Sequence, residues 1–268
     1  MAKFGKILGA GLGWAFGGPL GALFGVAVGA MLDKMDKGTP TEKEYQEKFA
    51  GYRHHSTKED FNRSLITLTA AVMQADGKVV VSELNYVKAF FKKSFGDEAA
   101  QEYLLILKEI LKQPFEVIDV CKQIAYYMEE PSKLQLVHYL FGIAISDDDL
   151  AHSEVELIHK ISIWIGISER DFRSIYSMFA RSQSDGQYQQ GGRSASRTTR
   201  PISQDFEILE VDQNADDAAI KKAYRKMAKK YHPDLVAHLG EEHVKGAKEK
   251  FQQVQQAYDR ICKAKNIV

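Results

Sequence analysis

The chain has 268 residues, and its 36 Lys and Arg residues balance its 36 Asp and Glu residues, so the formal net charge is zero. This balance argues against wholesale nucleic-acid binding, since proteins of that class carry a clear basic excess. The two cysteines, Cys121 and Cys262, fall in separate predicted domains, which argues against a disulfide framework.

Residues 1–37 are predicted to form a Gly-rich transmembrane anchor. The stretch from Ile7 to Leu32 contains no charged residue and is long enough to cross a bilayer as a single helix. In lipid, small residues on one helix face let helices approach closely, which predicts packing and self-association of the anchor. Glycine recurs at every fourth position here, at Gly5, Gly9, Gly13, Gly17, Gly21, Gly25 and Gly29.

Two alternatives to this single crossing helix stay open. Val28-Gly29-Ala30 resembles the small-residue cleavage site of a signal peptide, although the apolar stretch is longer than usual. The segment can also bend at Gly17-Gly18-Pro19 into a hairpin, or insert peripherally into the membrane surface. The Lys residues on its two sides are nearly balanced, so charge does not set its orientation.

Residues 38–55 form a polar connector, and residues 56–181 are predicted to form a helical domain. Apolar residues recur there at spacings of three and four, as on one face of a helix. Residues 75–83 also align with residues 146–154, and in each copy an apolar helix ends at an acidic turn before a new helix starts. This pattern resembles the tellurite-resistance TerB-like helical domain.

The two acidic turns are a candidate metal site. Oxygen ligands of this kind suit a hard divalent cation such as calcium, although the spacing is not that of an EF-hand loop. The alternative is structural, with Asp and Ser capping helix starts and Gly77 permitting the turn. Apart from such a cation, no cofactor is expected. The candidate ligands are Asp76, Glu83, Asp147, Asp148, Asp149 and Glu154.

Residues 182–202 are rich in Gln, Ser, Gly and Arg and predict a flexible linker, so the domain that follows, residues 203–268, is expected to move freely. This domain is predicted to begin with a short leading helix, and an amphipathic helix follows it. Pro233 disfavours the helical conformation at His232, so the helix should stop there and leave His232, Pro233 and Asp234 in an exposed loop. The polar face of the helix carries Lys221, Lys222, Arg225, Lys226, Lys229 and Lys230.

A second amphipathic helix follows the loop, with an apolar seam from Val244 to Ile261 that suits antiparallel packing on the first. Tyr231-His232-Pro233-Asp234 between two such helices resembles a J-domain. Other matching features are Phe206-Glu207-Ile208-Leu209 at the start and Ala257-Tyr258 in the last helix. Glu210 departs from the family, which often has Gly there, and is expected to change the turn slightly without changing function.

The J-domain resemblance implies recruitment of a DnaK-type chaperone and stimulation of its ATP hydrolysis. On this reading His232, Pro233 and Asp234 trigger hydrolysis, and the basic helix meets an acidic surface of the partner. The chain itself is not expected to be an enzyme, because no nucleophile or metal-ligand set accompanies His232 at a recognisable spacing.

The order of anchor, TerB-like domain and J-domain resembles the DjlA-type membrane-anchored co-chaperones over nearly the whole chain. The resemblance implies an all-α protein that crosses a bacterial inner membrane once, with its soluble domains in the cytoplasm. Its partners would be a DnaK-type chaperone, unidentified client proteins and membrane lipid. The alternative is a membrane-tethered, cation-responsive stress sensor or scaffold that works through the acidic turns.

Overall fold

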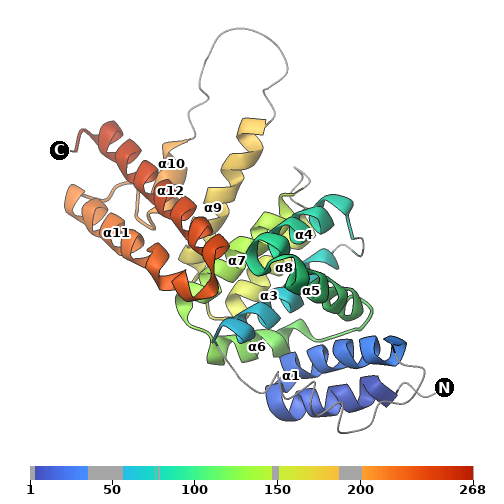
Figure 1. The fold of residues 1–268 in the computed structure, drawn as a ribbon. Helices are drawn as coiled ribbons and strands as arrows, with labels where there is room; N and C mark the ends of the chain where they lie inside the picture. Colours follow the sequence, from blue (N-terminus) through green and yellow to red (C-terminus); the bar gives the residue numbers. More distant parts are fainter. Residues whose placement is uncertain are drawn as a thin grey trace. The chain divides into compact units, whose positions relative to one another are not determined.

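The computed structural model describes residues 4–35, 57–75, 77, 79–146, 151–186 and 201–267 (Figure 1). Every regular element within these residues is a helix, which confirms the all-α prediction. By internal packing the chain divides into two units, Met1–Glu129 and Glu130–Val268.

The first element, α1 (Phe4–Met35), is a helical hairpin. Gly17 (φ −148°, ψ 15°) and Gly18 (φ 59°, ψ −148°) leave the helical region, and Pro19 begins the second arm. The φ of Gly18 is one that glycine adopts without steric cost. The single continuous helix expected over Ile7 to Leu32 is therefore wrong, and the alternative bend at Gly17-Gly18-Pro19 is confirmed. Within the described residues, no helix is both long and apolar enough to span a membrane.

Glycine brings the two arms of α1 into contact. A Cβ atom added at Gly9 would overlap the carbonyl oxygen of Gly25, and one added at Gly13 would overlap that of Gly21. Only bare backbone fits this approach, which is the packing that repeated small residues permit. The predicted glycine strip thus packs inside the hairpin, and self-association between copies stays a prediction.

The rest of the first unit is a set of helices on which α1 packs. The hairpin contacts α5, α6 and α3, while α4 packs on α5. The core is apolar, and Leu65, Leu68 and Ile106 in it are fully buried. These helices are α3 (Thr57–Met73), α4 (Val81–Phe95), α5 (Asp97–Ile110) and α6 (Val117–Tyr127).

The second unit contains two groups of helices in contact with each other. The first group is α7 (Glu130–Ala144), α8 (His152–Trp164) and α9 (Glu169–Gly186). The second group is α10 (Ile202–Ile208), α11 (Asp217–Lys230), the 3₁₀ helix η1 (Pro233–Leu239) and α12 (Glu241–Lys265).

The second group forms a small domain docked on the first. Its helices α11 and α12 pack on each other, and α10 packs on α12 (Figure 1). Phe206 in α10 and Leu209 just after it are buried. Helix α10 also packs on α9, and α12 and η1 contact α7. The linker composition predicted that this domain would move freely. The structure instead shows its helices packed on α7 and α9.

Candidate functional site

The tripeptide His232-Pro233-Asp234 lies exposed between α11 and α12. Helix α11 ends at Lys230, as Pro233 predicted, and His232 caps the start of η1 with an extended backbone. The predicted loop is thus partly a 3₁₀ helix, since proline suits the first position of such a turn. The side chains of His232 and Asp234 are 49% and 88% exposed. They can therefore both reach a partner protein.

The backbone of this turn holds the side chain of His232. The Nδ1 atom of His232 accepts a hydrogen bond from the backbone N–H of Asp234 at 3.3 Å. The Asp234 carboxylate lies 3.5 Å from the same nitrogen. In accepting this backbone hydrogen bond, Nδ1 uses its lone pair, so Nε2 is the ring nitrogen left to donate to a partner. The turn therefore presents a donor and an acidic acceptor side by side.

A packed base supports the turn. Tyr231 is buried just before it, and Val236 and Leu239 are buried within η1. The ring of His232 lies edge-on to Phe251 of α12, with 6.3 Å between centroids. Exposed side chains on a base of this kind are held near one geometry, which lowers the entropy lost on binding.

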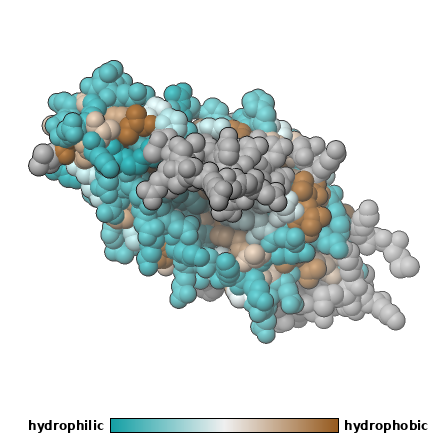
Figure 2. Space-filling view, turned by 90° about the horizontal axis from the view of Figure 1, so that it is seen from above, coloured by the Kyte–Doolittle hydropathy of each residue, from teal (hydrophilic) through white to brown (hydrophobic). Residues whose placement is uncertain are grey.

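The basic helix begins at a capping aspartate. Asp216 caps α11, and its carboxylate accepts a hydrogen bond from the N–H of Ala219 at 2.7 Å. Most of the predicted cations are open to solvent, whereas Lys221 and Lys230 are partly buried. The face in Figure 2 is mostly hydrophilic, and its hydrophobic residues appear as small, separate patches. The cations that α11 exposes are Lys222, Arg225, Lys226 and Lys229.

Carboxylates hold Lys226 and Lys230 of this helix, which the sequence did not predict. Lys226 Nζ lies 2.7 Å from Glu210 Oε2. Lys230 forms an ion pair with Asp171 of α9, and its Nζ lies 3.1 Å from Glu130 Oε1 and 3.8 Å from Glu210 Oε1. The signal that could have revealed this cluster is Glu210, a charged residue where glycine was expected.

Burial and charge shift the pKa values within this cluster. Burial and the hydrogen bond to Asp171 raise the pKa of Glu210. Burial also acts to raise the pKa of Asp171, but hydrogen bonds with Glu210, Lys230 and Ser168 outweigh it and lower the value. For Lys230, burial acts to lower the pKa, yet the Asp171 and Glu210 carboxylates raise it. The cluster therefore favours a charged Lys230 beside an ionised Asp171.

The acidic turns of the first helical domain lie largely outside the described residues, where Asp76, Asp147, Asp148 and Asp149 fall. Glu83 is buried and accepts a hydrogen bond from the N–H of Val80 at 3.0 Å, so it caps α4. Glu154 is buried in the first turn of α8. Across the described residues, no group of three potential ligand side chains is placed to hold a metal ion. The cation site stays a prediction.

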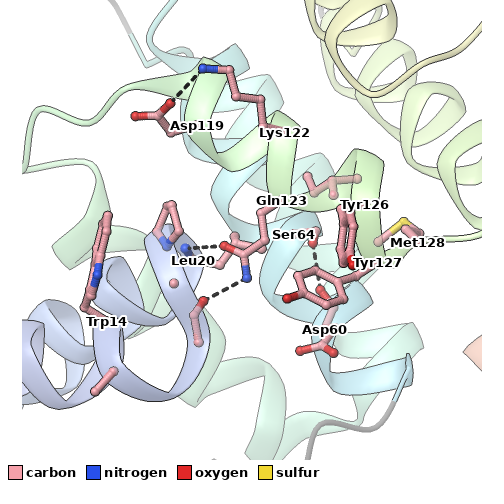
Figure 3. A pocket seen from close by; sticks show the side chains of 15 residues that line it. Trp14, Leu20, Asp60, Ser64, Asp119, Lys122, Gln123, Tyr126, Tyr127 and Met128 are labelled. Atoms are coloured by element: carbon pink, nitrogen blue, oxygen red, sulfur yellow. Dashed lines mark hydrogen bonds and ion pairs between the residues drawn. The ribbon is translucent and has the colours of Figure 1, made fainter.

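A second feature is a cavity of about 990 Å³ in the first unit, between the bend of α1 and the end of α6 (Figure 3). The amide of Gln123 reaches the bend, where its oxygen accepts from Leu20 N at 3.0 Å and its nitrogen donates to Gly17 O at 2.8 Å. Exposed rings of Trp14, Tyr126 and Tyr127 line the walls. Gln123 satisfies backbone groups that the non-helical bend at Gly17 and Gly18 leaves outside the helical ladder. This cavity is shaped by the hairpin and lies in the other unit from the His-Pro-Asp turn.

Three family models match the chain in order. The co-chaperone DjlA transmembrane domain matches residues 1–52, the tellurite resistance protein TerB matches residues 62–177, and the DnaJ domain matches residues 205–267. The match to residues 1–52 associates the segment that contains α1 with membrane anchoring. The match to residues 205–267 covers the exposed tripeptide and the basic helix.

Relatives named co-chaperone protein DjlA align with most of the chain. The protein of Haemophilus influenzae is 26% identical over 99% of both chains, and that of Vibrio parahaemolyticus is 29% identical over 99% of both. The protein of Vibrio vulnificus is 30% identical over 78% of this chain and 79% of its own length. No solved structure matches the chain.

Proposed function

Because the chain belongs to the DjlA family of co-chaperones, we propose that it recruits a DnaK-type chaperone and stimulates its ATP hydrolysis. The observation that carries the proposal is the exposed turn at His232, Pro233 and Asp234, which stands on a buried base beside a helix with exposed cations. The chain itself catalyses no reaction in this proposal and acts through its partner.

The proposed mechanism separates docking from triggering. Exposed cations of α11 steer an acidic partner surface toward the J-domain, and this step weakens as salt rises. His232 and Asp234 then offer one donor and one acidic acceptor to the docked partner. Since the backbone N–H of Asp234 already holds the His232 ring, that ring loses little freedom when it binds.

The proposed location is a bacterial inner membrane, with the helical domains on the cytoplasmic side. The family match of residues 1–52 supports a membrane anchor, and a partner that hydrolyses ATP supports the cytoplasmic side. The clients delivered to the chaperone would then be proteins at or near that membrane.

The test is single-turnover ATP hydrolysis by a DnaK-type chaperone, with and without the full chain in detergent, at two salt concentrations. Wild-type chain should accelerate hydrolysis, and more strongly at low salt. His232→Gln should lose about tenfold or more of this acceleration, which corresponds to about 1.4 kcal/mol of lost transition-state stabilisation. The turn is supported by Tyr231 and Val236, so the fold should survive the substitution.

The matched control is His238→Gln, which changes an exposed histidine of the same 3₁₀ helix. This variant should stimulate like wild type. Equal stimulation by wild type and His232→Gln would refute the proposed role of the turn.

A further inference from the structure

The J-domain is docked on α7 and α9 by polar contacts as well as by packing. The contacts come from both arms of its helical pair and from α10, so they hold the domain along its length rather than at one point. Three hydrogen bonds across this interface are Ser174 Oγ to Ile208 O (2.9 Å), Ser177 Oγ to Glu207 Oε2 (2.5 Å) and Lys250 Nζ to Gln135 Oε1 (2.7 Å).

The ion pairs of Lys230 lie in the same interface. Its side chain is only 13% exposed, and that of Asp171 is 5% exposed. An ion pair shielded from water to this degree is screened by salt much less than a surface pair. Lys230 is therefore removed from the solvent-exposed basic face as long as the domain stays docked.

Glu210 completes the cluster at a cost in backbone strain. Its φ is 56°, in the left-handed region that costs a non-glycine residue on the order of 1 kcal/mol. Its side chain is 3% exposed and contacts Lys226. Strained residues persist where the surrounding structure requires them, often at switches. Glycine would relieve this strain but would leave Lys226 and Lys230 without the carboxylate.

We propose that Asp171, Glu130 and Glu210 act as an internal competitor for the acidic surface of the chaperone. This inference rests on the proposed function and adds a restraint to it. The ammonium groups of Lys226 and Lys230 that these carboxylates hold belong to the helix expected to meet the partner. Lys230 is also two residues from His232, so the competition acts beside the trigger. Docking on α7 and α9 thus attenuates the J-domain, and release of the domain frees Lys230 from Asp171 and Glu130.

The restraint is partial, because three other cations of α11 stay exposed in the docked state. Lys222, Arg225 and Lys229 are open to solvent, and so is the His-Pro-Asp turn. A chaperone can therefore meet the docked domain, but it meets fewer free cations. Affinity should then depend on whether the carboxylates are present.

The test compares binding of an ATP-bound DnaK-type chaperone to the full chain and to its variants in detergent at low salt. Asp171→Asn should tighten binding roughly two- to fivefold, the range for gaining one exposed ion pair. The matched control is Glu169→Gln, which removes the same charge from the same helix but pairs with His159 and Arg173 instead. It should bind like wild type.

Asp171 also accepts a hydrogen bond from Ser168 at the start of α9, so its substitution can weaken that helix. Glu210→Gly provides an independent variant, because it removes a carboxylate and relieves strain at the same time. It should also tighten binding. The gain from Asp171→Asn should disappear when Lys230→Gln is added, because the freed ammonium group is the cause of the gain.

Each outcome decides between the two proposals. Tighter binding by Asp171→Asn and Glu210→Gly, but not by Glu169→Gln, supports the internal competitor. Equal or weaker binding by both variants overturns it and leaves the co-chaperone function in place, as does a gain that survives Lys230→Gln. If neither wild type nor any variant binds the chaperone, the proposed function fails and the competition fails with it.

Discussion

The hairpin of α1 and the pair of α11 and α12 are held together by opposite means. In α1 the arms meet backbone to backbone, at Gly9 with Gly25 and at Gly13 with Gly21. In the J-domain, α11 and α12 meet through side chains, and Tyr224 stacks on Tyr258 with 4.3 Å between ring centroids. The first hairpin depends on the absence of side chains, and the second depends on their shape.

This difference decides what each hairpin can do. Backbone contact leaves no space for an added atom, so the packing of α1 requires glycine at these positions, and glycine offers no functional group. Side-chain contact spreads the packing over many atoms and leaves the outer face of α11 free to carry charge. The residues proposed to act on a chaperone lie on the second hairpin, while the first is suited to close packing of helices.

The largest predicted effect comes from adding one methyl group to the first hairpin. Gly13→Ala places a Cβ against the Gly21 carbonyl, and backbone cannot move aside as a flexible side chain can. The arms should separate, which a dye pair near the two ends of α1 would report as a longer distance.

The matched control for this change is Gly11→Ala. A Cβ at Gly11 meets nothing within 4 Å, and alanine should stabilise the helix by about 0.5–1 kcal/mol relative to glycine. Replacing Gly by Ala should thus destabilise the hairpin at Gly13 and stabilise it at Gly11. An unchanged dye distance in Gly13→Ala would show that the arms are not in backbone contact.

The next effect concerns a lysine that is buried where the second hairpin meets α7. Lys250 is almost fully buried, and burial lowers its pKa from 10.5 to about 7. Between these values the unfolded chain binds a proton that the folded chain does not. Stability should therefore rise with pH, by up to about 2 kcal/mol from pH 7 to pH 9.

Thermal unfolding of the full chain across this pH range measures the effect. The midpoint of wild type should rise, whereas that of Lys250→Met should change much less, because the shifted group is gone. Lys248→Met changes an exposed lysine of the same helix and should keep the wild-type pH dependence. A slope that persists in Lys250→Met would assign the pH dependence to another group.

Much of the second hairpin could be predicted because its signals are local. The cap at Asp216 and the helix end before Pro233 are each set by residues a few positions apart. The core side chains Ile220 and Met227 follow the same short spacing and are fully buried. Such patterns need no knowledge of the rest of the chain.

The docking of the J-domain could not be predicted in the same way. Asp171 and Lys230 are 59 positions apart, and no local pattern joins them. The linker composition argued for free movement, but contacts outside the linker hold the domain in place. The sequence Gly17-Gly18-Pro19 offered a bend in α1 as an alternative, yet the length of the apolar stretch favoured a single helix. In both cases packing between distant segments decided the result.

The smallest effect tests how well side-chain packing tolerates a change of one methyl group, the same size as the change in Gly13→Ala. Ile220→Val removes one methyl group from a fully buried position of α11 and should cost about 0.5–1.5 kcal/mol of unfolding free energy. Hydrogen exchange of the slowest amides in α11 and α12 would measure this loss. Ile163→Val, at a side chain 56% exposed, should change little and serves as the control. Chaperone stimulation should survive Ile220→Val, because the neighbouring side chains can relax toward the space that is left. Loss of the folded J-domain in this variant would mean that its packing is as intolerant as that of α1, and the contrast between the two hairpins would no longer hold.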